Sequence, residues 1–147
     1  MFTQDRRSDA PQPLRVLIAD DHLANRNLLC RVLSRAGCAT TVAENGRAAL
    51  DACRAGVFDA ILMDLHMPEM DGLAAIRAIR VLEREIGRPS TPIILCSADA
   101  DHRKQALAAG ADSYVLKPIA PRELLAELAA IAGGHGNSVS RYLDTGK

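Results

Sequence analysis

Short apolar runs alternate with longer amphipathic stretches along the chain, from residue 14 to about residue 132. Uninterrupted apolar runs of about 4–8 residues are typical of buried strands, whereas apolar residues that recur three and four positions apart form one face of a helix. We therefore expect five strands, each followed by a helix. The strand-like runs are LRVLIA (14–19), CATTVA (38–43), FDAILM (58–63), PIILC (92–96) and SYVL (113–116).

This alternation indicates the fold class. Strands that alternate with helices form a parallel sheet with helices on both faces, because the connections between parallel strands are right-handed. The chain has 147 residues, of which 48% are hydrophobic, which suits one core and not two ordinary domains. We predict a single α/β domain with a doubly wound (βα)5 fold, whose five-stranded parallel sheet has the order 2-1-3-4-5.

The two ends of the chain lack this pattern. Residues 1–13 are polar and carry Pro11 and Pro13, and residues 133–147 begin with two glycines and are mostly small and polar. Segments of this composition are typical of tails and linkers. We therefore predict a domain over residues 14–132, between a flexible N-terminal tail (1–13) and a flexible C-terminal tail or linker (133–147).

Charge and composition exclude several kinds of partner. The 18 basic residues balance the 18 acidic ones and no basic block stands out, so we expect no direct nucleic-acid binding. No apolar run approaches the ~20 residues of a membrane span, so we expect no membrane insertion. The four cysteines fit no metal-binding spacing, and reduced thiols of this kind are typical of a cytoplasmic protein.

Polar residues directly follow four of the predicted strands. Asp20 and Asp21 follow the first strand and Asp64 follows the third, while Ser97 and Lys117 follow the fourth and the fifth. In an open parallel sheet the ligand crevice lies at the carboxyl ends of the strands, where the strand order reverses. The first and third strands are neighbours in the predicted order, so we expect the three carboxylates to meet there.

Three carboxylates in one pocket require a cation. Two unit charges about 5 Å apart repel by roughly 3 kcal/mol at an effective dielectric constant of about 20. Oxygen ligands alone favour a hard ion, Mg²⁺ or Mn²⁺, and Mg²⁺ often completes its shell with phosphate oxygens. With that ion bound, one carboxylate can act as a nucleophile toward phosphorus, while Lys117 and Ser97 hold the phosphate oxygens.

Five segments resemble the motifs of the receiver domain of two-component response regulators. They are IADDH (18–22), LMDLHMPEMDGL (62–73), PIILCSA (92–98), GAD (110–112) and YVLKP (114–118), and they follow the family's order across essentially all of residues 14–132. The stretch after Asp71 is most similar to receivers of hybrid sensor kinases and phosphorelays. The resemblance implies a flavodoxin-like fold, in agreement with the strand pattern.

The resemblance also implies the phosphorylation site and the metal ligands. Asp64 matches the phosphoacceptor, and Asp20 and Asp21 match the acidic pair. The family's metal is Mg²⁺, which implies that Asp21, Asp64 and the backbone carbonyl of His66 bind it. Asp20 is expected to act on the ion through a water molecule.

Other matching positions imply a conformational switch. Ser97 and Tyr114 match the two switch positions, and Lys117 matches the lysine that contacts phosphate and precedes a cis proline. On phosphorylation Ser97 is expected to move toward the phosphate, and the space that it leaves lets Tyr114 turn inward. His66 and Asp99, two residues past the acceptor and the switch hydroxyl, are expected to tune the lifetime of the phosphorylated state.

These expectations favour a signalling switch over an enzyme. The switch takes a phosphoryl group from a histidine kinase or a histidine phosphotransfer protein onto Asp64. A downstream protein then binds the surface of the fourth helix, fifth strand and fifth helix. Two alternatives stay open at this point: an aspartate-nucleophile phosphatase, which requires a second aspartate where His66 stands, and a phosphorylation-independent binding module of the same fold.

Overall fold

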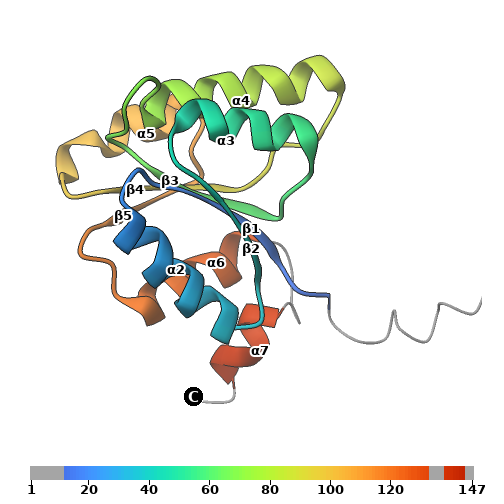
Figure 1. Ribbon diagram of the computed structural model, residues 1–147, viewed down its shortest axis with the longest axis vertical. Helices are drawn as coiled ribbons and strands as arrows, with labels where there is room; N and C mark the ends of the chain where they lie inside the picture. The colour runs from blue at the N-terminus through green and yellow to red at the C-terminus, as the bar shows by residue number, and fades with distance from the viewer. Residues whose placement is uncertain (1–11, 133–137, 145–147) are drawn as a thin grey trace, which may run out of the picture.

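The computed structural model describes residues 12–132 and 138–144. Within them a five-stranded parallel sheet has the order β2-β1-β3-β4-β5, which confirms the predicted fold class and topology (Figure 1). Each strand begins and ends within two residues of the predicted run. The strands are β1 (Arg15–Ala19), β2 (Ala39–Ala43), β3 (Ala60–Asp64), β4 (Ile93–Ser97) and β5 (Ser113–Leu116).

Helices cover both faces of the sheet (Figure 1). One face carries α3 (Gly46–Ala55), α4 (Gly72–Ile86) and α5 (Arg103–Ala109), and a short 3₁₀ turn, η1 (Ala100–His102), precedes α5. The other face carries α2 (Leu23–Arg35) and α6 (Pro121–Ile131). This is the doubly wound arrangement that right-handed crossovers produce.

Two hydrophobic cores fill the space between the sheet and its helices. β3 and β4 are buried along their whole length, as expected of central strands that are covered on both faces. Alternate side chains of a strand point to opposite faces, so Ile61 and Met63 pack on the α3 and α4 side, whereas Leu62 packs on the α2 and α6 side. β2, at the edge, is largely exposed. Burial therefore holds the ends of the central strands in a defined place.

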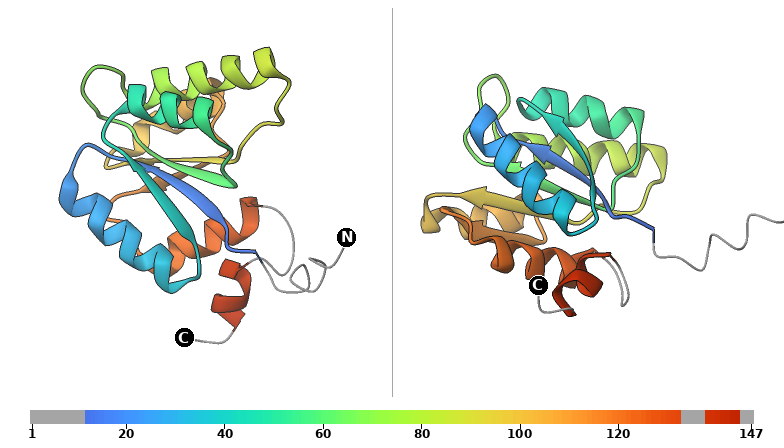
Figure 2. Two further views of the ribbon diagram at one scale, coloured as in Figure 1. Left: turned by 45° about the vertical axis from the view of Figure 1, so that its right-hand side comes forward. Right: turned by 60° about the horizontal axis from the view of Figure 1, so that its bottom comes forward.

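Part of the segment expected to be a flexible tail is instead a helix. α7 (Ser138–Asp144) packs against α6 (Figure 2). Val139 is fully buried in the core beneath α2 and α6, and Tyr142 and Leu143 pack at the same place. These three residues lie at helical spacing and form one apolar face, a short pattern that the surrounding small and polar residues conceal. Residues 12 and 13 of the expected N-terminal tail are exposed. The other residues of the expected tails, 1–11, 133–137 and 145–147, lie outside the described residues.

Neither membrane spans nor disulfides shape the described part of the chain. None of its helices combines the length and the apolar character that a membrane crossing requires. None of the four cysteines, all of which lie in the described residues, forms a disulfide, and Cys38, Cys53 and Cys96 are buried. Burial raises the pKa of the Cys96 thiol to about 12, so this side chain stays protonated and behaves as a small apolar residue.

Candidate functional site

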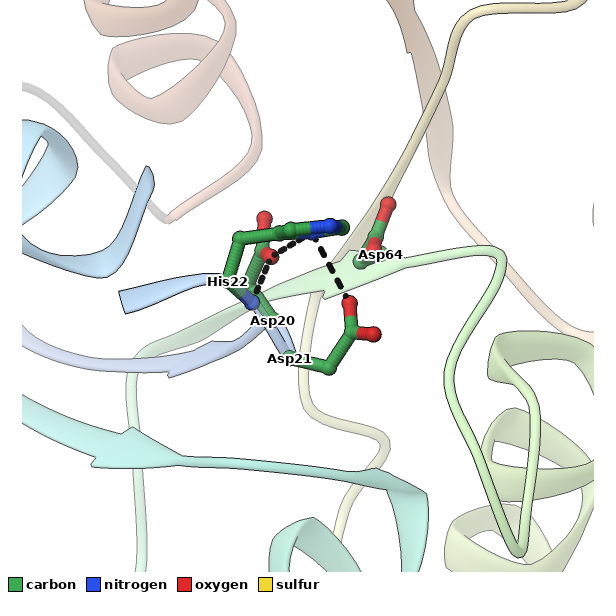
Figure 3. Close-up of side chains that lie close together, drawn as sticks. All are labelled: Asp20, Asp21, His22 and Asp64. Atoms are coloured by element: carbon green, nitrogen blue, oxygen red, sulfur yellow. Dashed lines mark hydrogen bonds and ion pairs between the residues drawn. The ribbon is translucent and has the colours of Figure 1, made fainter. Parts of the chain in front are cut away.

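The carboxyl ends of β1 and β3 bring acidic side chains together. The two strands are neighbours, so Asp20 and Asp21, which follow β1, lie beside Asp64 at the end of β3. One ligand atom each from these three carboxylates and from the imidazole of His22 lie within 4.8 Å of one another (Figure 3). The expected three-carboxylate pocket is present, and it includes a histidine that sequence reasoning missed. Its position directly after the acidic pair was the available signal.

Lys117 reaches this pocket from the end of β5. Its Nζ donates a hydrogen bond to Asp64 Oδ1 at 2.7 Å and lies 3.7 Å from Asp20 Oδ2. Asp20 and Asp64 are only 3% and 6% exposed, so both contacts are shielded from water. The peptide bond between Lys117 and Pro118 is cis, as the resemblance implies. Strand ends that are far apart in the sequence thus form one charged pocket.

Burial and neighbouring charges shift the pKa values of the central pair. Burial raises the pKa of Asp64; the hydrogen bond from Lys117 opposes this rise, and the charges of Asp20 and Asp21 add to it. Burial by itself lowers the pKa of Lys117, but the hydrogen bond to Asp64 and the charges of Asp64 and Asp20 outweigh that effect and raise it. Lys117 therefore stays cationic, and its one ammonium group contacts two of the three carboxylates.

The donor atoms of the pocket fit a divalent cation. Asp21 Oδ1 is buried and accepts no hydrogen bond, although His22 Nδ1 lies 3.1 Å away. A buried carboxylate oxygen without a partner is unfavourable, and a bound cation would satisfy it. His66, whose backbone carbonyl the resemblance adds to the ligands, lies two residues beyond the end of β3 with an exposed side chain. The described residues can thus hold a hard cation among carboxylates.

Ser97 and Tyr114 are linked through the backbone of Asp99. Ser97 ends β4 and is 1% exposed, and its Oγ accepts a hydrogen bond from the Asp99 N–H at 3.0 Å. The Tyr114 hydroxyl donates to the Asp99 carbonyl oxygen, and the tyrosine is buried. The side chain of Tyr114 is therefore buried with its hydroxyl at the loop after β4. The backbone N–H and carbonyl of Asp99 thus connect Ser97 to Tyr114.

A second histidine lies between the two residues that were expected to tune the phosphorylated lifetime. The rings of His66 and His102 meet edge to face, with centroids 6.1 Å apart. His102 Nδ1 lies 3.5 Å from Asp99 Oδ2. Sequence reasoning missed His102, because it is distant from His66 along the chain and only the fold of the loops brings them together.

Comparison with known proteins identifies the family. The family model of the response regulator receiver domain matches residues 16–129. The chain is 37% identical over 121 residues to the sensory/regulatory protein RpfC of Xanthomonas campestris pv. campestris, covering 81% of the chain and 16% of RpfC. It is 39% identical over 125 residues to the sensor protein GacS of Pseudomonas syringae pv. syringae, covering 80% of the chain and 14% of GacS. The chain thus spans a small part of the length of these relatives.

A solved structure shows the same architecture. The receiver domain of the sensor histidine kinase PA1611 from Pseudomonas aeruginosa PAO1 is 30% identical, with a TM-score of 0.75, over 83% of this chain and 99% of that one. That protein was crystallised with a magnesium ion coordinated in its active site cleft. Together with these likenesses, the sheet order and the strand-end pocket place the chain in the class of doubly wound receiver domains.

The chain belongs to the response regulator receiver family. Receiver domains are signalling domains of two-component and phosphorelay systems and are generally not classed as enzymes. Magnesium binding is typical of the family. Family membership leaves the aspartate-nucleophile phosphatase without support.

Proposed function

We propose that this domain is a phosphoacceptor switch, in which Asp64 takes a phosphoryl group from a phosphohistidine of a histidine kinase or a histidine phosphotransfer protein. The hydrogen bond of 2.7 Å from Lys117 Nζ to Asp64 Oδ1, inside a pocket of three carboxylates, carries the proposal. Lys117 orients the acceptor and remains cationic beside the incoming phosphate oxygens. Membership of the receiver family supports this class of donor.

The transfer replaces one bond to phosphorus with another. A carboxylate oxygen of Asp64 attacks phosphorus, the bond between phosphorus and the donor imidazole nitrogen breaks, and that nitrogen takes up a proton. Lys117 and the Ser97 hydroxyl hold the other phosphate oxygens, and the product is an aspartyl phosphate. A divalent ion, when bound, supplies positive charge that offsets the phosphoryl group and the carboxylates.

We assign Mg²⁺ as this ion, and Mn²⁺ as its possible substitute. Asp21, Asp64 and the backbone carbonyl of His66 are the proposed direct ligands, and Asp20 acts through a water molecule. The unsatisfied Asp21 Oδ1 and the proximity of the three carboxylates support this assignment. Hard oxygen donors of this kind are the usual ligands of Mg²⁺.

An apolar cavity beside the pocket is the place that we assign to the phosphodonor protein. The cavity has a volume of about 450 Å³, lies between α2 and α6, and is lined at one end by Asp20 and Lys117. Leu28 of α2 lines it and is 49% exposed. A donor helix packed on this apolar surface would bring its phosphohistidine close to Asp64.

We further propose that a downstream protein binds the surface of α5, β5 and α6, which are the fourth helix, fifth strand and fifth helix of the sequence-based scheme. Leu107 of α5 and Leu116 of β5 are large apolar residues exposed on these elements. The link from Ser97 through Asp99 to Tyr114 supports a connection between this surface and the pocket. Four cysteines without a disulfide among them favour a reducing compartment, so we place the domain in the cytoplasm.

Small-molecule phosphorylation tests the proposal. Acetyl phosphate with Mg²⁺ should add one phosphoryl group to the wild-type domain, visible by intact-mass spectrometry and removed by base. Asp64→Asn should take up none, whereas Asp51→Asn, at an exposed position on α3, should take up as much as wild type. Equal uptake by Asp64→Asn would refute the assignment of the acceptor. No uptake by the wild type would favour the phosphorylation-independent binding module.

A further inference from the structure

His22 has the placement of a metal ligand. It is the residue before α2, its side chain makes no capping hydrogen bond, and its imidazole is 68% exposed. Even so, Nδ1 lies over the acidic pair, 3.1 Å from Asp21 Oδ1 and 3.5 Å from Asp20 Oδ1 (Figure 3). An exposed side chain has many other orientations, so a specific reason is needed for this one.

The spacing of these atoms is also compatible with a shared cation. Asp21 Oδ1 accepts no hydrogen bond despite its short distance to the imidazole nitrogen. Two ligands at about 2.1 Å from one ion, on adjacent corners of an octahedron, lie about 3.0 Å apart. The separation of 3.1 Å between Nδ1 and Oδ1 matches that value. Asp20 and Asp64 provide oxygen atoms inside the same cluster, which spans at most 4.8 Å.

We propose that His22 supplies its Nδ1 as a further ligand when a first-row transition ion such as Mn²⁺ or Co²⁺ occupies this pocket, whereas Mg²⁺, the ion assigned above, keeps oxygen ligands alone. Mg²⁺ takes oxygen ligands, whereas imidazole nitrogen suits the later first-row ions. The inference rests on the proposed metal site at Asp21 and Asp64. It adds a fourth direct ligand to that site and gives a chemical reason why the site would distinguish one kind of ion from another.

His22→Ala tests the role of the nitrogen, because an exposed side chain without a cap can be removed with little effect on folding. Calorimetry should give the ratio of the dissociation constants for Mg²⁺ and Co²⁺. We expect this ratio to fall at least about tenfold in His22→Ala, with Mg²⁺ affinity changed by less than about twofold. The matched control, His102→Ala, removes a histidine outside the cluster and should leave the ratio unchanged. An unchanged ratio in His22→Ala would overturn the proposal.

Pulsed electron paramagnetic resonance of bound Mn²⁺ gives a readout that is independent of affinity. Modulation from a coordinated ¹⁴N nucleus should be present in the wild type and in His102→Ala, and absent in His22→Ala. A wild-type site that binds Mn²⁺ without this modulation, or modulation that survives in His22→Ala, would also overturn the proposal. Either result would leave Asp64 phosphorylation with Mg²⁺ untouched, since intact mass reports it separately. Failure of the wild type to bind any divalent ion would overturn both the inference and the proposed metal site.

Discussion

Lys117 neutralises only part of the charge that Asp20, Asp21 and Asp64 bring together. Buried carboxylates destabilise a fold unless cations or hydrogen bonds compensate them. Burial raises the pKa of Asp64 in spite of its hydrogen bond to Lys117, which means that its ionised form is less favourable in the folded chain than in the unfolded one. The residues that the proposed function needs therefore lower the stability of the metal-free domain.

Removing the charge of Asp64, the proposed acceptor, should stabilise the metal-free domain. In the presence of a chelator at pH 7, Asp64→Asn should raise the free energy of unfolding by on the order of 1 kcal/mol, a fraction of the roughly 3 kcal/mol repulsion between two close carboxylates. The advantage of the variant should shrink as the pH falls toward the unfolded-state pKa of about 3.9. The pKa of Asp64 is raised in the folded wild type, so its carboxyl is protonated there at a higher pH than in the unfolded chain, and the cost of its charge disappears. Urea titrations at several pH values measure both effects.

Saturating Mg²⁺ should reverse the order of stability, since it binds the folded wild type in preference to the unfolded chain. Asp51→Asn, on an exposed helix surface, serves as the control and should match wild type throughout. A variant Asp64→Asn that is less stable than wild type at pH 7 without metal would contradict the electrostatic argument.

His66 should slow hydrolysis of the aspartyl phosphate. Its exposed imidazole lies two residues past Asp64, the proposed acceptor, and packs edge-on against His102, so it can fill part of the approach path of water. His66→Ala should shorten the half-life a few-fold, which corresponds to about 1 kcal/mol in the barrier. The decay of the phosphorylated mass at fixed pH and saturating Mg²⁺ measures this. A longer half-life would mean that His66 assists the attacking water, and Asp99→Ala tests the second expected position in the same way.

Elements differ in how clearly the sequence reveals them. β3 and β4 were predictable because strands covered on both faces leave uninterrupted apolar runs. α7 was not, because its apolar face comprises only three residues and becomes recognisable as a helix where it packs on α6. The loop after β3 was equally hidden: Glu69 has a φ of 68°, a conformation set by the surrounding packing and not by residue preference.

The start of α4 should tolerate no side chain at Gly72. Its N–H donates to the Leu65 carbonyl at 2.8 Å, and a Cβ there would lie 2.3 Å from the Asp64 carbonyl oxygen. Gly72→Ala must therefore displace the backbone that carries Asp64. We expect a loss of about 2 kcal/mol or more in unfolding free energy, together with slower phosphorylation by acetyl phosphate.

Gly56→Ala is a matched control for this prediction. Gly56 has an extended backbone, and the nearest atom to an added Cβ is the Arg15 guanidinium at 3.8 Å. Urea unfolding and phosphorylation rates should both stay close to wild type in this variant. Wild-type stability and rate in Gly72→Ala would show that the loop can move without disturbing Asp64.

For the molecule as a whole, the sequence predicts which strand-end residues lie together in the pocket, but not the hydrogen bonds that link the pocket to other residues. Strand order and right-handed crossovers bring four residues together, and few other topologies obey the same rules. These residues are Asp20, Asp21, Asp64 and Lys117. The bridge from Ser97 to Tyr114 depends on side-chain orientations in a loop, and so on packing between distant segments. His22 and His102 escaped notice for the same reason, since each gains its neighbours only through the folded geometry.

That bridge should carry phosphorylation to the distant surface. Ser97 Oγ accepts a hydrogen bond from the Asp99 N–H, and the Tyr114 hydroxyl donates one to the Asp99 carbonyl. Asp99 lies directly before η1 and α5. When the Ser97 hydroxyl turns away to donate to phosphate, the Asp99 N–H loses its acceptor. The present conformation of the loop after β4 then becomes less stable relative to a conformation without this hydrogen bond. Phosphate shifts their populations only through this difference in affinity.

Nuclear magnetic resonance with beryllofluoride and Mg²⁺ tests the route. In the wild type, chemical shifts should change around Asp64 and also at Asp99, Tyr114 and α5. Ser97→Ala should keep the changes near Asp64 and lose those at Tyr114 and α5, because the variant has no hydroxyl to exchange between the two partners. Tyr114→Phe should still accept phosphate but lose the response of α5, since the ring no longer holds the Asp99 carbonyl. A wild-type response of α5 in both variants would show that the signal leaves the pocket by another path.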